Sequence, residues 1–145
     1  MANRFHLAIT AGDLDVAAAF YCDLLGCAQG HSETGSRDGW VDIDFWGNEL
    51  TLHASKPDES VHGNRHDVDM GNVVVPHFGV HLSASDFAKL KQRLYDRKVV
   101  FVNKPYIRFA DTVFEQETFF ITDPHGNVLE IKTMKNPDKL FEIIK

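Results

Sequence analysis

Two histidines and one glutamate are the side chains of this chain most able to do chemistry. They are His6 in FHLAIT (residues 5–10), His77 in HFGVHL (77–82) and Glu130 in VLEIKT (128–133). Two neutral imidazoles and a carboxylate suit a divalent first-row metal ion and leave coordination positions open for a substrate. A buried carboxylate also needs a compensating charge or hydrogen bonds, so Glu130 requires a partner inside an apolar strand.

Strand alternation predicts that these three side chains share one side of a sheet. Large apolar residues alternate with them, as Leu7 and Ile9 do with His6. If the apolar faces pack against helices, the polar faces line a concave side, where the three side chains converge. The alternatives are a hydrogen-bonded pocket histidine and a simple ion pair of Glu130 with an arginine such as Arg108.

The elements that would position these residues occur twice along the chain. In the first half, strand 5–10 precedes a helix that begins at Asp13 and ends at Gly26. A faint strand at about 28–34 follows, and then a hairpin of strands 40–46 and 49–54 around Gly47-Asn48.

The second half repeats this order. Strand 77–82 precedes a helix that Asp86 is expected to cap, and strands are expected at 99–102, 118–123 and 128–133. Overlaying the halves places His6 on His77, an offset of 71 residues (77 minus 6). The repeat makes the two histidines equivalent positions rather than a chance pair.

The sequence therefore predicts a single α+β domain over residues 1–145. Two βαβββ modules, about 4–56 and about 75–134, would form one open barrel-like sheet with a concave metal or ligand site, because half the chain buries too little apolar surface alone. The polar linker, about 57–74, is expected to be a long surface loop that includes His62 and His66, and a tail covers 135–145.

Composition narrows the class of protein and its partners. Hydrophobic residues make up 43% and charged residues 25% of the 145 residues, as in soluble globular proteins. The net charge of −6 without a basic stripe argues against nucleic acid. No apolar run approaches the ~18 residues of a membrane span, and no signal-peptide core is visible. We expect a cytoplasmic protein whose Cys22 and Cys27 are reduced structural thiols.

The order FHLAIT, GDLDVAAAFYCDLLG, VPHFGVHL and FFITDPHGNVLEI resembles the vicinal oxygen chelate superfamily. This superfamily contains glyoxalase I, fosfomycin-resistance thiol transferases, extradiol dioxygenases and metal-free bleomycin-binding proteins. The resemblance covers nearly the whole chain, and FYCDLLG and DPHGNVLE are its most specific parts. It implies paired βαβββ modules, a homodimer, and Fe, Mn, Ni or Zn held by His6, His77 and Glu130.

The chain departs from each better-known branch of the superfamily. Glyoxalase I usually adds a Glu ligand where this chain has Thr51, although Glu49 and His53 lie two residues to either side. Extradiol dioxygenases usually carry a Tyr where Phe120 stands, and an upstream His that is missing between residues 82 and 124. Fosfomycin-type transferases need a cationic patch, for which only Lys104, Arg108 and Lys132 are available.

The resemblance implies an enzyme, a lyase, transferase or dioxygenase, that acts on a small oxygenated substrate. The metal would chelate two substrate oxygens and stabilise an oxyanion. His81 or His53 would serve as base, although each of these two histidines equally fits an orienting role, and Trp46 (or Trp40), Tyr106 and Arg108 would contact substrate. The alternatives are a metal-free protein that sequesters a small molecule and a structural metal without turnover. We expect no role for His31 or His125.

Overall fold

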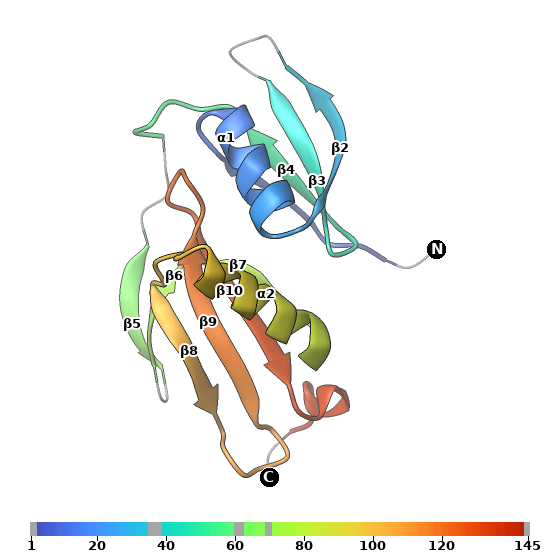
Figure 1. Ribbon diagram of the computed structural model, residues 1–145, viewed down its shortest axis with the longest axis vertical. Helices are drawn as coiled ribbons and strands as arrows, with labels where there is room; N and C mark the ends of the chain where they lie inside the picture. Colours follow the sequence, from blue (N-terminus) through green and yellow to red (C-terminus); the bar gives the residue numbers. More distant parts are fainter. Residues whose placement is uncertain (1–2, 35–38, 60–62, 69–70, 144–145) are drawn as a thin grey trace. The chain divides into compact units, whose positions relative to one another are not determined.

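The computed structural model describes residues 3–34, 39–59, 63–68 and 71–143 (Figure 1). The chain divides into two compact units. The first is Met1–His62 together with Asp123–Asn127, and the second is Gly63–Thr122 together with Val128–Lys145.

The first unit is built on β1 (His6–Thr10), α1 (Leu14–Ala19), β2 (Ala28–Glu33), β3 (Trp40–Phe45) and β4 (Asn48–His53). The Asp13 side chain accepts a hydrogen bond from the Val16 N–H and so caps α1, as predicted. A π-helical turn, η1 (Phe20–Leu24), extends α1 until Gly26, whose φ of 84° ends it. The strands lie in the order β1-β4-β3-β2, with β1 parallel to β4.

The second unit repeats this order with one addition. It contains β7 (Phe78–His81), α2 (Ala84–Asp96), β8 (Asn103–Arg108), β9 (Gln116–Thr122) and β10 (Val128–Met134), in the sheet order β7-β10-β9-β8. A separate hairpin, β5 (Asn64–Val68) with β6 (Gly71–Val75), precedes β7, and a short 3-10 helix, η2 (Pro137–Lys139), follows β10.

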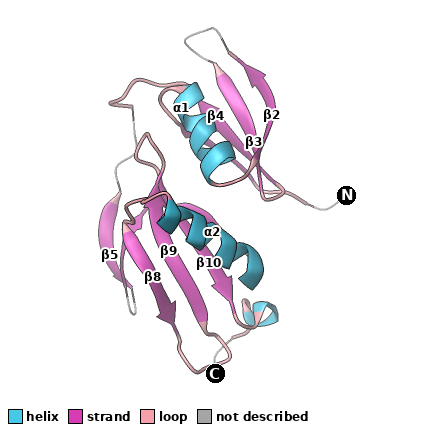
Figure 2. Cartoon of the chain, in the orientation of Figure 1, coloured by secondary structure: helices cyan, strands magenta, loops and turns pink. Residues whose placement is uncertain are grey.

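One helix packs on one face of each four-stranded sheet, and these layers form the two cores (Figure 2). In the second unit, Phe87, Leu90 and Leu94 of α2 are buried, and the Phe87 ring lies 5.3 Å from that of Phe119 on β9. Leu129 and Ile131 of β10 are fully buried. The opposite face of this sheet therefore carries the polar residues of the same strands.

The α+β class and the two βαβββ modules are confirmed, and the sheets are open. Hydrogen bonds among the described residues divide the strands into one sheet per module, rather than joining them in one continuous sheet. Parallel pairing of the first and last strand occurs in both modules, β1 with β4 and β7 with β10.

Three local predictions were wrong. Ser83, not Asp86, caps α2: the Ser83 Oγ accepts from the Asp86 N–H. The strand expected at 99–102 begins at Asn103, because the Val99 N–H still bonds Leu94 of the helix end. The linker is not simply a loop, since 64–68 and 71–75 pair as a hairpin. His66 lies in β5, and His62 lies outside the described residues.

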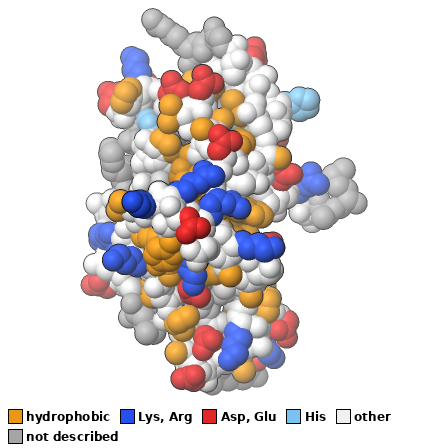
Figure 3. All heavy atoms as spheres, viewed as in Figure 1, with side chains coloured by type: hydrophobic (Ala, Val, Ile, Leu, Met, Phe, Trp, Pro, Cys, Tyr) orange, Lys and Arg blue, Asp and Glu red, His pale blue; other side chains and the backbone are white. Residues whose placement is uncertain are grey.

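On the face viewed in Figure 3, acidic and basic side chains are intermingled with hydrophobic ones. Within the second unit, Lys91 of α2 and Glu117 of β9 form an ion pair of 2.6 Å. None of the helices in the described part of the chain is long and apolar enough to span a membrane.

Candidate functional site

His77 and Glu130 lie together in the second unit. His77 immediately precedes β7, and Glu130 stands in β10 between the fully buried Leu129 and Ile131. The His77 Nε2 is 3.2 Å from the Glu130 Oε1, while the His77 Nδ1 is 2.5 Å from the Val74 carbonyl oxygen. Because a carbonyl only accepts, Nδ1 carries the proton and donates, which leaves Nε2 toward the carboxylate.

Glu130 is held from two further directions. Thr118 Oγ1 on β9 donates to Glu130 Oε2 at 2.6 Å, and Lys132 Nζ lies 3.7 Å from Oε1. Burial opposes ionisation of Glu130, but the hydrogen bonds from His77 and Thr118 and the charge of Lys132 outweigh it, so its pKa falls to about 2. Glu130 is therefore a carboxylate at neutral pH.

The hydrogen bond with Glu130 is the main cause that raises the pKa of His77; burial opposes this effect, and the bond to Val74 adds to it. His81, opposite Lys132 on the neighbouring strand, has the reverse shift. Burial and the Lys132 charge lower the pKa of His81, which keeps its imidazole neutral and able to accept a proton.

A cavity of about 200 Å³ opens beside this pair. His77, Glu130, Tyr106 and Arg108 supply its polar lining, and its apolar lining is Val68, Val73, Val75 and Phe120. Burial is the main cause that raises the pKa of Tyr106, so its hydroxyl stays protonated and can donate. The structure thus brings together four of the residues that the sequence singled out.

The remaining predicted residues belong to the first unit. The His6 Nδ1 is 2.6 Å from the Glu49 Oε1, and both side chains are about half exposed. The register pairs His6 with Glu49 and Ala8 with Thr51, as it pairs Gly79 with Glu130 in the second unit. Thr51 is therefore the counterpart of Glu130, and it donates to Asp42 at 2.6 Å.

His53 and Trp46 lie near opposite ends of β4, in the β3–β4 hairpin of the first unit. His53 ends β4 opposite Trp40, and Trp46 lies in the turn before β4, with a φ of 47° and its ring 4.8 Å from Phe45. In the described part of the chain, no group of three or more His, Cys, Asp or Glu side chains is placed to hold a metal ion. The convergence of His6 with His77 and Glu130 stays a prediction.

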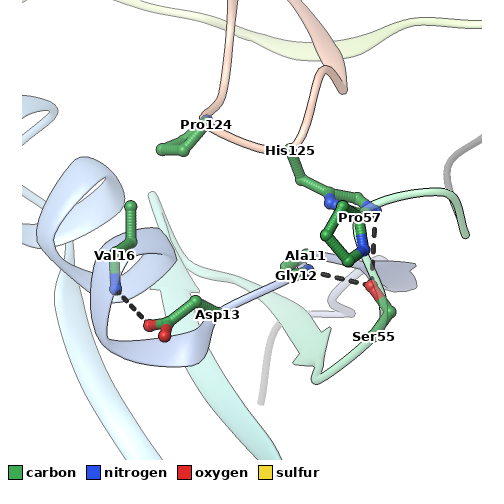
Figure 4. Close-up of a pocket in the computed structure, with 8 residues that line it drawn as sticks. All are labelled: Ala11, Gly12, Asp13, Val16, Ser55, Pro57, Pro124 and His125. Carbon is green, nitrogen blue, oxygen red and sulfur yellow. Dashed lines mark hydrogen bonds between the residues drawn. The ribbon is translucent and has the colours of Figure 1, made fainter.

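A second cavity, of about 390 Å³, lies in the first unit beside a Ser–His pair (Figure 4). The His125 Nε2 is 3.2 Å from the Ser55 Oγ and 3.1 Å from the Glu59 carbonyl oxygen. The carbonyl requires Nε2 to carry the proton, so His125 donates to Ser55 and cannot accept its proton there. The pair is not arranged as a nucleophile with its base.

Comparison with known proteins identifies the family. The model of the Glyoxalase/Bleomycin resistance protein/Dioxygenase superfamily matches residues 4–131. The chain belongs to this superfamily. Among curated proteins, no sequence match was found.

Solved structures show the same fold over nearly the whole chain. A glyoxalase/bleomycin resistance protein/dioxygenase from Alicyclobacillus acidocaldarius is 32% identical, with a TM-score of 0.72 and 96% of each chain covered. The fosfomycin resistance protein FosX from Listeria monocytogenes is 11% identical, with a TM-score of 0.68 and coverage of 97% of this chain and 99% of that one. TnmS3, an antibiotic-binding protein from Streptomyces sp. CB03234, is 18% identical, with a TM-score of 0.58 and coverage of 93% and 98%.

Within this member of the superfamily, sequence reasoning missed Thr118 and the three valines of the cavity. Thr118 shares a strand face with Phe120, so alternation along β9 was a usable signal. The valines could not be placed from the sequence, because they lie in the β5–β6 hairpin, whose polar first strand resembles a loop.

Proposed function

We propose that this protein is a metal-dependent enzyme that acts on a small oxygenated substrate, with His6, His77 and Glu130 as metal ligands. The observation that carries the proposal is the geometry of His77. Its Nδ1 donates to the Val74 carbonyl, and its Nε2 is directed at the Glu130 carboxylate. Metal-binding histidines commonly donate their second ring nitrogen in this way, which fixes the tautomer.

The donor set fits a divalent cation. An Nε2 lone pair and a carboxylate oxygen 3.2 Å apart are both acceptors, so they require a cation between them, either a proton or a metal ion. His6 is arranged in a similar way, because its Nδ1 lies 2.6 Å from the Glu49 Oε1, and the proposal assigns its Nε2 to the metal. This pairing supports Glu49 as an orienting partner of His6 rather than a fourth ligand.

A divalent ion bound there would supply Lewis acidity toward substrate oxygens. Side chains of the protein would transfer the proton and bind the substrate. His81, kept neutral by burial and by Lys132, would accept a proton from the substrate. Tyr106 would donate a hydrogen bond to a substrate oxygen, and Arg108 would balance negative charge in the cavity. His53 and Trp46 are proposed to contribute from the first unit.

Metal content and affinity test this proposal directly. Protein purified without chelators is expected to contain Fe, Mn, Ni or Zn by elemental analysis. His77→Ala, Glu130→Ala and His6→Ala should each weaken metal binding to the stripped protein by at least about 10-fold. His31→Ala, in β2 of the first unit, is the control and should bind metal normally.

The proposal fails if the purified protein holds no metal and the three variants bind added metal as the wild type does. Binding of a small molecule without metal would then favour a sequestering protein, the activity class of the antibiotic-binding relative. For a metal-bearing protein, catechols under oxygen and glutathione hemithioacetals separate the dioxygenase from the lyase reaction. The homodimer that the resemblance implies is tested by light scattering.

A further inference from the structure

The β5–β6 hairpin presents one face to the cavity beside His77 and Glu130. Every second residue of β6 points to the same side of the strand, which places Gly71, Val73 and Val75 together. A Cβ built on Gly71 would lie 2.6 Å from the Tyr106 hydroxyl, which shows that this side faces β8. Val68, the cross-strand partner of Gly71, completes the apolar wall of the cavity.

The hairpin is fixed to the rest of the second unit by polar contacts that leave the valines out. Arg65 Nη1 donates to the Asn72 carbonyl at 2.6 Å and to Asn103 Oδ1 at 3.0 Å. Asn103 Nδ2 on β8 also donates to the Asn72 carbonyl, at 3.0 Å. The wall is therefore held against β8 independently of what the valines contact.

Among the described residues, two of the three valines of this wall are partly exposed. Val68 is 39% exposed and Val75 is 42% exposed, whereas Val73 between them is buried. When a ligand removes an apolar side chain from water, the free energy of the complex falls by about 25 cal/mol per Å² of buried surface. Within about 200 Å³ the cavity lining combines the polar pair of His77 and Glu130 with partly exposed valines, which suits a ligand that has both a polar and an apolar part.

We propose that this hairpin is the specificity element of the site and that it selects a compact, branched or aromatic hydrocarbon group. The ligand would present its oxygens toward His77 and Glu130, and place that group against Val68, Val73 and Val75. Tyr106 and Arg108, which also line the cavity, would bind its polar portion. This inference rests on the proposed metal site and adds the shape of the molecule that the site accepts.

Hydroxamates test it, because they chelate a divalent ion through two oxygens and carry a variable hydrocarbon group. Nickel-loaded protein is titrated with acetohydroxamate, isobutyrohydroxamate, benzohydroxamate and a naphthyl hydroxamate. We expect the isobutyro and benzo compounds to bind about 10-fold more tightly than acetohydroxamate, since they cover the valines. The naphthyl compound should lose this gain because it exceeds the cavity.

Variants of the valines separate specificity from stability. Val68→Ala/Val75→Ala changes exposed side chains, so it should fold, and it should reduce the gain to less than about 3-fold with acetohydroxamate affinity unchanged. Val75→Phe should exclude benzohydroxamate while acetohydroxamate still binds. Val113→Ala, at a similarly exposed valine outside the cavity lining, is the matched control and should keep the wild-type order of affinities.

Each outcome decides one question. Equal affinities across the series, or an unchanged preference in the double variant, would overturn the specificity role of the hairpin and leave the metal site standing. If nickel-loaded protein bound no acetohydroxamate, the proposed function itself would fail, and the inference about the hairpin with it.

Discussion

At the scale of single residues, Glu130 shows how a carboxylate is kept charged inside an apolar strand. Its neighbours in β10 are fully buried, yet three groups compensate the charge, namely His77 just before β7, Thr118 of β9 and Lys132 of β10 itself. Through His77 and Thr118 the carboxylate links β10 to the start of β7 and to β9. The free energy of folding should therefore depend on its ionisation.

We predict that the metal-free protein is most stable between about pH 4.5 and 6.5. The pKa of Glu130 is lowered from 4.5 to about 2 in the folded state, so its contribution is present above pH 4.5 and is lost as the pH falls toward 2. The pKa of His77 is raised from 6.5, so its contribution is present below pH 6.5 and is lost as the pH rises through the raised value.

The measurement is urea unfolding of chelator-treated protein at several pH values, compared with Glu130→Gln. Wild type should lose about 3 kcal/mol more than the variant between pH 5.5 and pH 2, given about 1.4 kcal/mol per pKa unit. Parallel acid profiles for the two proteins would show that Glu130 is not held as the geometry indicates.

At the scale of elements, Gly79 is the residue that allows β7 to pair with β10. A Cβ at Gly79 would lie 1.5 Å from the Glu130 carbonyl oxygen, so any side chain there must displace the strand that carries Glu130. The equivalent position of the first module is Ala8, paired with Thr51, where a methyl group is tolerated. The close approach is thus particular to the module that holds the carboxylate.

Gly79→Ala should destabilise the protein by about 3 kcal/mol or more and also weaken metal binding through Glu130. Gly30→Ala is the matched control, because its Cβ would meet Asp42 at an ordinary 3.5 Å in an outer strand of the first sheet. Thermal unfolding and metal titration of both variants give the comparison. A Gly79→Ala protein as stable as Gly30→Ala would mean that β7 and β10 are not so close.

Elements with strict alternation and clear ends could be predicted from the sequence, whereas those set by distant contacts could not. The strands around His6, His77 and Glu130 follow from alternation, and Asp13 follows from its position before α1. Residues 99–102 have the composition of a strand, but the Val99 N–H donates to the Leu94 carbonyl at the end of α2. The hairpin at 64–75 is polar on one strand, and its partner residues on β8 lie some 30 residues away, as Asn72 and Asn103 do.

At the scale of the whole molecule, the turn between β9 and β10 is part of the first unit. Asp123 is buried and accepts hydrogen bonds from the Tyr21 hydroxyl and from the backbone and side chain of Asn127. The Asn127 side chain also donates to the Thr10 carbonyl at the end of β1. The first unit is therefore completed only by residues that precede β10, so residues 1–62 should not fold alone.

Tyr21→Phe in the full chain tests whether the turn between β9 and β10 stabilises the first unit. The hydroxyl donates to Asp123 at 2.8 Å, and a hydrogen bond to a charged group contributes about 1.5–3 kcal/mol. We expect a loss of that size in urea unfolding followed by tryptophan fluorescence, because both tryptophans, Trp40 and Trp46, lie in the first unit.

Tyr95→Phe, at a half-exposed position of α2, is the control and should change the unfolding free energy by less than about 0.5 kcal/mol. Asp123→Ala should cost more than Tyr21→Phe, since it leaves the buried Tyr21 hydroxyl without its acceptor and also removes the acceptor of the Asn127 backbone and side chain. If Tyr21→Phe lost no more than Tyr95→Phe, the turn would not stabilise the first unit. A folded fragment of residues 1–62 would contradict the same argument independently, because that fragment contains Tyr21 and Thr10 without either of their partners.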